Sequence, residues 1–484
     1  TIHYERLDAI RKKLRQEGVD GFILSNGDEF FSEYPPEHEK RIEWLTGFTG
    51  SAATVVALDH DQPYRSAFFT DGRYMLQAEK EVDSELYEIH NIADITPTEW
   101  LKKNAAGDSI GFDPWLIAAE QLRKWYDKAR NLLWVPMQEK PIHALWTDRP
   151  VAPSAPAFEY PLEYAGKSRQ EKIAVIVKQL KETDVSAVLL TQPESVNWLL
   201  NIRGNDIEHT PILLCRAIVT ANGKVYLYAP EDKVPEHLRE GIRVYPPDAL
   251  RKHCKRWNQG SMWLQCSVTP VKLKQALKAG EVEIIDKTDP CTLLKALKNE
   301  TELQHIRQTH VTDGLAVTKF LHWLATADSM PTEASAANKL EAFRRASPEF
   351  REPSFPTISG FGPNGAIVHY RAEETDCLTF EKDNLYLVDS GGQYLGGTTD
   401  VTRTVAIGIP SREMCENYTR VLQGHIAICS AIFPVGTNGN QLDSLARKPL
   451  WDAGIDYDHG TSHGVGCYMS VHEGPQSISK RSNG

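Results

Sequence analysis

The chain has 484 residues, of which 41% are hydrophobic and 25% are charged, and its formal net charge is −11. At roughly 100 to 200 residues per domain, this length predicts two to four domains. The acidic balance argues against non-specific nucleic-acid binding, and no apolar run approaches the roughly 18 residues of a transmembrane helix. We therefore expect a globular protein that binds neither nucleic acid nor membrane.

Eight cysteines are scattered along the chain without the CxxC spacing of a zinc ribbon. They are typical of free thiols in a reducing compartment, so we expect a cytoplasmic location. No basic segment followed by an apolar one marks a signal peptide at the N-terminus. Because the chain begins with Thr1 rather than Met, a removed leader and a trimmed N-terminus both remain open.

The N-terminal region predicts a helix followed by strands. Apolar residues recur at helical spacing over residues 1–17, and short apolar strands are predicted at 21–25, 54–58 and 67–70. A Trp-Leu-x-Gly segment lies between the first two strands. The predicted apolar face of the helix comprises Tyr4, Leu7, Ile10 and Leu14.

The same order of elements returns over residues 168–228, again with a Trp-Leu segment after the first strand. This repetition predicts two similar α/β domains that arose by internal duplication. The proline-rich segment 150–161 is the natural linker between them. The predicted domains are 1–155, 156–296 and, for the rest of the chain, 297–484.

The third region predicts helices followed by strands. Asn299 is a predicted N-cap with an acidic residue three positions on, and it opens a long helix. A second helix fits residues 332–345, strands fit 357–361 and 366–370, and a third helix fits 412–432. We expect only strands and turns after that helix. The predicted apolar face of the long helix comprises Leu303, Ile306, His310, Leu315, Val317 and Leu321.

Residues 385–405 contain two apolar, β-branched runs around a glycine-rich middle, which predicts a hairpin. Asp389 and Asp400 lie one on each run. Residues that face each other across a hairpin lie about 5 Å apart, so the two carboxylates would repel each other unless a cation lay between them. The alternative is that each aspartate caps a turn beside glycine.

Histidines gather near the C-terminal end of the chain. His459 and His463 have the i, i+4 spacing of a metal-binding helix, but the surrounding glycines favour a loop. His472 follows shortly after them. His369 ends the predicted strand 366–370, where the alternative to a site residue is a hydrogen-bonded, partly buried histidine.

Taken together, these segments resemble the pita-bread metallopeptidases. The motifs are Phe361-Gly-Pro-Asn-Gly-Ala-Ile-Val-His-Tyr370, Val388-Asp-Ser-Gly-Gly-Gln-Tyr394, Thr399-Asp-Val-Thr-Arg-Thr404, and His459-Gly-Thr-Ser-His-Gly-Val-Gly466 with Val471-His-Glu-Gly-Pro475. The resemblance covers nearly the whole chain and is strongest to the long, three-domain cytosolic form of aminopeptidase P. It implies an α/β (α+β) protein with two creatinase-like domains before a pita-bread catalytic domain.

The resemblance also implies a metal site. Asp389 and His463 would each bind a metal ion, and Asp400 would bridge two ions. The ions would be two Mn²⁺ that share a water or hydroxide, with Co²⁺ or Zn²⁺ as possible replacements. Mostly oxygen ligands with one imidazole suit such ions.

Further implied roles concern the other histidines and the substrate. His369 and His472 would contact substrate and stabilise the tetrahedral intermediate, and His459 would lie near the same pocket, where it would either support the pocket or bind substrate. The substrates would be peptides with proline at the second position, and the enzyme would be a cytoplasmic homodimer.

One departure from the family pattern leaves alternatives open. The family has two further glutamate ligands, which would lie beyond Gly484, and Glu473 is not one of them. We therefore expect the sequence to be a truncated form with an incomplete catalytic domain, and a chain that ended there to bind metal weakly. The alternatives are a non-catalytic pita-bread protein that binds a peptide or protein partner, a prolidase-type dipeptidase, and a metal-free hydrolase related to creatinase.

Overall fold

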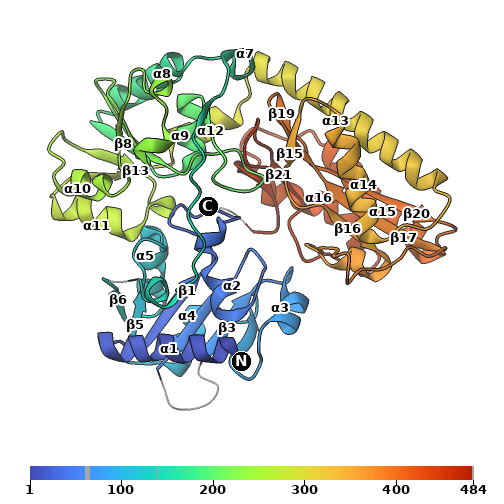
Figure 1. Cartoon of the computed structure of the whole chain (residues 1–484), viewed down its shortest axis with the longest axis horizontal. Coiled ribbons are helices and arrows are strands. Elements are labelled where there is room, and N and C mark those ends of the chain that lie inside the picture. Colours follow the sequence, from blue (N-terminus) through green and yellow to red (C-terminus); the bar gives the residue numbers. More distant parts are fainter. Residues whose placement is uncertain (60–65, 139, 482–484) are drawn as a thin grey trace. The chain divides into compact units, whose positions relative to one another are not determined.

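A computed structural model of the chain describes residues 1–59, 66–138 and 140–481 (Figure 1). The chain forms two compact units. Within the described residues, no helix is long and apolar enough to cross a membrane. The first unit comprises Thr1–Tyr160 with Lys167–Cys291, and the second comprises Pro161–Gly166 with Thr292–Gly484.

The first unit contains two six-stranded sheets with the same topology. Their strand orders are β4-β3-β2-β1-β5-β6 and β12-β11-β10-β8-β13-β14. In each sheet the first strand pairs antiparallel with the second strand and parallel with the fifth. The two similar α/β domains predicted from the repeated order of elements are therefore confirmed.

The bounds of these elements follow the predicted order closely. The first sheet contains β1 (Gly21–Ser25), β2 (Thr54–Leu58), β3 (Ser66–Thr70), β4 (Glu88–Asn91), β5 (Ser109–Phe112) and β6 (Leu133–Pro136). Its helices are α1 (Ile2–Glu17), α2 (Arg41–Thr46), α3 (Met75–Glu81), α4 (Pro97–Asn104), α5 (Ala119–Lys128) and α6 (Pro141–Leu145).

The second domain repeats this series. Its main sheet contains β8 (Ala187–Leu190), β10 (Arg216–Thr220), β11 (Val225–Tyr228), β12 (Arg243–Tyr245), β13 (Met262–Leu264) and β14 (Ile284–Asp286), and β7 (Phe158–Glu159) pairs with β9 (Ile202–Arg203). Its helices are α8 (Arg169–Glu182), α9 (Pro193–Leu200), α10 (Ala249–Lys255) and α11 (Val271–Ala279).

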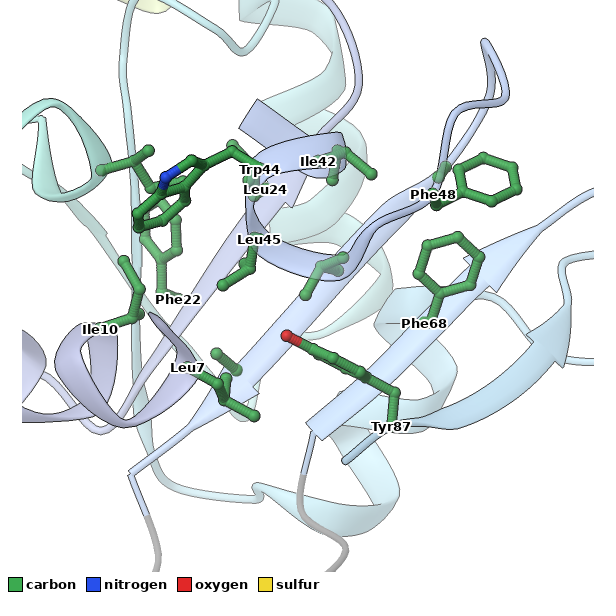
Figure 2. Close-up of a cluster of buried hydrophobic side chains, with 14 of the residues drawn as sticks. Leu7, Ile10, Phe22, Leu24, Ile42, Trp44, Leu45, Phe48, Phe68 and Tyr87 are labelled. Carbon is green, nitrogen blue, oxygen red and sulfur yellow. The ribbon is translucent and has the colours of Figure 1, made fainter. Parts of the chain in front are cut away.

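A cluster of buried side chains joins α1 and α2 to the first sheet (Figure 2). Leu7 and Ile10 of α1 are buried, as the helical spacing predicted, and Trp44 of α2 stacks on Trp146. Tyr4 is an exception because its side chain is 55% exposed. The repeated Trp-Leu segment thus serves as core packing in the first domain.

The part of the second unit that the structure describes contains four longer helices and three small sheets. The helices are α13 (Glu300–Thr326), α14 (Glu333–Arg345), α15 (Arg412–Cys429) and α16 (Gly439–Trp451), with the short α7 (Leu162–Ala165) beside α13 and α12 (Pro290–Ala296) leading into the unit. The sheets are β16 (Ile358–Phe361)-β17 (Asn384–Ser390)-β20 (Val401–Ile407), β15 (Phe350–Pro353)-β18 (Gly392–Tyr394)-β19 (Gly397–Thr398), and β21 (Ser462–Gly464)-β22 (Glu473–Ile478).

Helix α13 buries a face that overlaps only partly with the predicted one: Val317 is buried and Leu321 packs against the core, as predicted. Asn299 caps the helix as predicted, but Leu315 is 57% exposed and His310 is also exposed. The buried face instead carries Asp313, whose carboxylate pairs with the buried Arg344 of α14 at 2.8 Å and accepts a hydrogen bond from the Tyr394 hydroxyl. The apolar pattern missed this part of the face because a buried ion pair forms it.

Two other predictions for this unit are wrong. Residues 366–370 do not form a strand, because the chain turns through a 3₁₀ helix at Gly362–Ala366 and continues as irregular structure. After α15 the chain forms α16 rather than strands alone, and this helix contains Pro449, which the sequence pattern does not favour in a helix.

Candidate metal centre

Strands β17 and β20 bring the two aspartates together, with a correction to the predicted hairpin. Asp389 is paired across the ladder with Thr402, and Asp400 lies one residue before β20. The glycine-rich middle forms β18 and β19, which pair with each other in a second, smaller hairpin. Although they are not register partners, the two carboxylates interact, since Asp400 raises the pKa of Asp389.

Asp389 is held in an environment that disfavours its charge. Burial, together with repulsion from Asp400, raises its pKa to about 7, although contacts with Thr402 and His472 oppose the shift. Its Oδ1 atom is buried and has no hydrogen-bond partner among the residues that the structure describes. A buried carboxylate oxygen without a donor is a natural ligand for a cation.

Asp400, His463 and His472 converge on one point. Each of these residues offers a ligand atom, and the three atoms lie within 4.8 Å of one another. The closest approach is 3.2 Å, between His463 Nε2 and Asp400 Oδ2. The rings of His463 and His472 are nearly perpendicular, with centroids 4.5 Å apart. Three of the predicted site histidines and aspartates therefore form a compact group next to Asp389.

The backbone fixes the orientation of the His463 ring. Its Nδ1 lies 2.7 Å from the carbonyl oxygen of Gly464, which can only accept, so Nδ1 carries a proton. In the neutral imidazole the lone pair is then on Nε2, the atom that faces Asp400. A lone pair and a carboxylate oxygen 3.2 Å apart repel each other unless a proton or a metal ion lies between them.

Packing against the small sheet places His472. The side-chain amide of Gln393 on β18 donates to the carbonyl of Met469 at 2.7 Å, and Thr398 on β19 accepts from the Met469 amide at 3.3 Å. Glu473, the next residue after His472, is buried and pairs with Lys295 and Lys298. This pairing agrees with the expectation that Glu473 is not a metal ligand.

His459 lies on the loop before β21, outside the group of three ligand atoms. Its ring packs against that of Tyr457 in a tilted arrangement with centroids 4.7 Å apart, and its Nδ1 donates to the carbonyl of Gly460. Arg447 of α16 holds this loop by donating to the carbonyls of Tyr457 and His459.

His369 lies in the irregular turn that replaces the predicted strand. The adjacent Tyr370 packs against Phe355, Ile358 and Val471. Ile358 is the ladder partner of Asp389, and Val471 directly precedes His472. This packing places the turn that contains His369 next to the segments that carry Asp389 and His472.

Two anchoring residues were missed by the sequence analysis, Glu333 and Arg447. Both are charged residues on helices, and both are fully buried. Glu333 follows Thr332, which caps α14, and this capping position is the only sequence signal for it. Nothing in the sequence around Arg447 marks it as buried.

The donor set fits a divalent metal. Asp389 and Asp400 offer carboxylate oxygens, one of them unpartnered within the described structure, and His463 offers an oriented imidazole nitrogen. Oxygen-rich sites with one imidazole suit Mn²⁺ and Co²⁺, and they also accept Zn²⁺.

Comparison with known proteins shows the family to which the chain belongs. Residues 304–484 match the family model of metallopeptidase family M24, and residues 6–145 and 148–302 match two models of the creatinase/prolidase N-terminal domain. A Laccaria bicolor protein named as a probable Xaa-Pro aminopeptidase P is 39% identical over 99% of this chain and 76% of its own length. The chain belongs to the M24 metallopeptidase family.

Other relatives also match this chain along its full length. A Neurospora crassa protein of the same name is 38% identical over 99% of this chain and 73% of its own length. The crystal structure of an X-prolyl aminopeptidase from Caenorhabditis elegans, described as a cytosolic enzyme with a di-nuclear active site, superposes with a TM-score of 0.93. That protein is 31% identical, and the alignment covers 100% of this chain and 82% of the other.

A more distant match concerns the fold alone. The prolidase from Pyrococcus horikoshii superposes with a TM-score of 0.51 at 23% identity, over 64% of this chain and 85% of the other. The predicted fold class, family and metallopeptidase character are thus confirmed.

Proposed function

We propose that this M24 protein hydrolyses the peptide bond between an N-terminal residue and a following proline, with two divalent metal ions at the group formed by Asp389, Asp400 and His463. The observation that carries the proposal is the approach of His463 Nε2 to Asp400 Oδ2 at 3.2 Å, beside the buried and unpartnered Oδ1 of Asp389 within the described structure. The full-length similarity to proteins named Xaa-Pro aminopeptidase supports the reaction and the substrate.

Asp389 and His463 would each hold one ion, and Asp400 would bridge the two. We propose Mn²⁺ as the ion, with Co²⁺ or Zn²⁺ as replacements, because the donors are mostly oxygens. When bound, such a pair of ions would lower the pKa of a shared water and polarise the scissile carbonyl.

The chain's own residues then act on the substrate. His472, whose ring lies against that of His463, would donate a hydrogen bond to the carbonyl oxygen as negative charge develops there. His369 would provide a second donor from the turn beside Val471. His459 is exposed, so it would contact the peptide at the mouth of the site.

We also propose that the enzyme is a homodimer in the cytosol. The solved structure of the Caenorhabditis elegans relative is described as cytosolic, which supports the location. Light scattering after size-exclusion chromatography tests the dimer, because a dimer has twice the 54.4 kDa mass of the chain. A mass that matches one chain at all concentrations would contradict it.

The activity is tested with the tripeptide Arg-Pro-Pro. We expect release of arginine in the presence of Mn²⁺, loss of release after chelation, and recovery on addition of Mn²⁺. Arg-Ala-Ala is the matched control and should not be cleaved. Release that a chelator leaves unchanged would contradict the proposal.

The same assay separates the alternatives. A prolidase-type dipeptidase would cleave an Xaa-Pro dipeptide and leave the tripeptide intact. A non-catalytic relative would cleave neither peptide, with or without metal.

A further inference from the structure

The carboxylate of Glu333 is buried at the first turn of α14, outside the proposed metal site. The Glu333 residue as a whole is 0% exposed. It follows the N-cap Thr332, so the carboxylate lies where the helix dipole favours negative charge. A buried carboxylate in a protein interior requires several donors to offset the loss of water.

Glu333 receives those donors from one segment of chain. Its Oε1 accepts from the amide of Phe361 at 2.7 Å, and its Oε2 accepts from the amide of Leu378 at 2.9 Å and from the hydroxyl of Tyr370 at 2.6 Å. The side-chain amide of Asn364 contacts both oxygens. A single carboxylate therefore holds both ends and the middle of the segment 361–378.

His369 is the residue next to the central anchor. Because Tyr370 donates to Glu333 and packs on Phe355, Ile358 and Val471, its position is fixed on two sides. The pKa of Tyr370 is raised by burial and by its contact with Glu333, so this hydroxyl remains a donor. The backbone at 369 has little freedom while this contact is intact.

We infer that Glu333 is a positioning residue for His369: through Tyr370 and the amides at 361 and 378, it sets where the His369 imidazole stands in the active site. This inference rests on the proposed function, in which His369 contacts the substrate. In this inference Glu333, a buried residue of the neighbouring helix α14, affects the rate of the reaction although it contacts neither metal nor peptide.

Two variants test the inference. Glu333→Gln keeps the shape but turns one acceptor into a donor that faces the donors of the segment. Tyr370→Phe removes only the central anchor and is the milder change if Glu333→Gln fails to fold. Glu341→Gln, on the exposed side of the same helix, is the matched control.

We expect Tyr370→Phe to lower kcat by roughly 10-fold to 100-fold with a much smaller change in KM, since misplacement of a catalytic group by about 1 Å can cost that much. Mn²⁺ affinity should not change, because the metal ligands are untouched. In a His369→Ala background, Tyr370→Phe should cause no further loss. An equal loss of kcat in both backgrounds would overturn the inference.

A readout independent of activity keeps the two proposals separate. We expect Tyr370→Phe to shift and broaden the imidazole ¹⁵N resonances of His369 but not those of His463, and Glu341→Gln to shift neither. If the wild-type protein lacks peptidase activity, the proposed function fails, and these resonances alone decide whether Glu333 positions His369. Unchanged His369 resonances would overturn the inference.

Discussion

Arg447 shows how a buried charge can organise a loop near the proposed metal centre. Its guanidinium is 1% exposed, pairs with Asp443 at 2.7 Å and Asp456 at 2.9 Å, and donates to the carbonyls of Tyr457 and His459. Thr461, just before β21, also donates to Asp443. The segment that leads to His463 is therefore tied to α16 by one arginine and its partner aspartate.

Replacement of Arg447 with methionine should destabilise the second unit by about 3 to 5 kcal/mol, because it leaves the buried carboxylate of Asp443 without its cation. The adjacent Lys448→Met is the control, since the Lys448 side chain is 65% exposed and its pair with Asp452 contributes at most about 1 kcal/mol. Urea unfolding of both variants measures the difference. Equal stabilities would contradict a structural role for the Arg447 pair.

The burial of Asp28 predicts that the stability of the first unit depends on pH. It is 2% exposed, and burial raises its pKa to about 6 despite hydrogen bonds from Ser32 and Phe30. A raised folded-state pKa stabilises the fold at low pH, and this stability is lost as pH rises through the folded pKa. Relative to Asp28→Asn, the wild-type protein should lose about 2 kcal/mol between pH 4 and pH 7.

Urea unfolding at several pH values measures this loss. The stability difference between wild type and Asp28→Asn should fall with rising pH and then level off above about pH 7. A difference that does not depend on pH would show that Asp28 ionises normally.

At the scale of elements, the tight turn after β17 sets the geometry of the aspartates. A Cβ at Gly391 would collide with the carbonyl oxygen of Thr399 and with the Ser354 hydroxyl. Gly391→Ala should therefore push β17 and the 399–400 segment apart, lower the melting temperature and weaken Mn²⁺ binding. In α13, Gly314 has open space around its Cβ position, so Gly314→Ala should stabilise by about 1 kcal/mol.

Thermal unfolding and metal titration of the two glycine variants check this contrast. Mn²⁺ binding should change only in Gly391→Ala. A Gly391→Ala protein that binds Mn²⁺ like wild type would show that the turn does not control the aspartate pair.

The sequence predicted elements best where local pattern and packing agree. The N-cap of α13, the span of α14 and the strands around Asp389 were found from motif and periodicity. Residues 366–370 were misassigned because their apolar run looked like a strand, whereas the donors gathered by the distant Glu333 hold them as a turn. Helix α16 was missed because Pro449 lies inside it.

For the site, the sequence identified the residues that could bind metal but not the contacts that orient them. Asp389, Asp400, His463 and His472 were all predicted, and the structure brings them together. The orientation of His463 by the Gly464 carbonyl could not be predicted, because it depends on backbone geometry rather than residue type.

At the scale of the molecule, the duplicated domains and the proposed metal centre belong to different compact units. We therefore expect two calorimetric transitions. The proposed Mn²⁺ ligands all lie in the second unit. Mn²⁺ at 100 times its dissociation constant should therefore stabilise one transition by about 2.7 kcal/mol and leave the other unchanged. Arg447→Met should lower the same transition, which assigns it; a metal shift of both transitions or of neither would contradict this division.

Electron paramagnetic resonance of added Mn²⁺ tests the metal centre most directly, because bound ions lose the six-line signal of free Mn²⁺. We predict that the wild-type protein and the control Asp328→Asn, an exposed change in the same unit, reduce the free signal equally. Asp400→Asn and His463→Ala should each weaken binding by at least about 10-fold. Binding by Asp400→Asn and His463→Ala as tight as that by wild type would contradict the proposed metal centre.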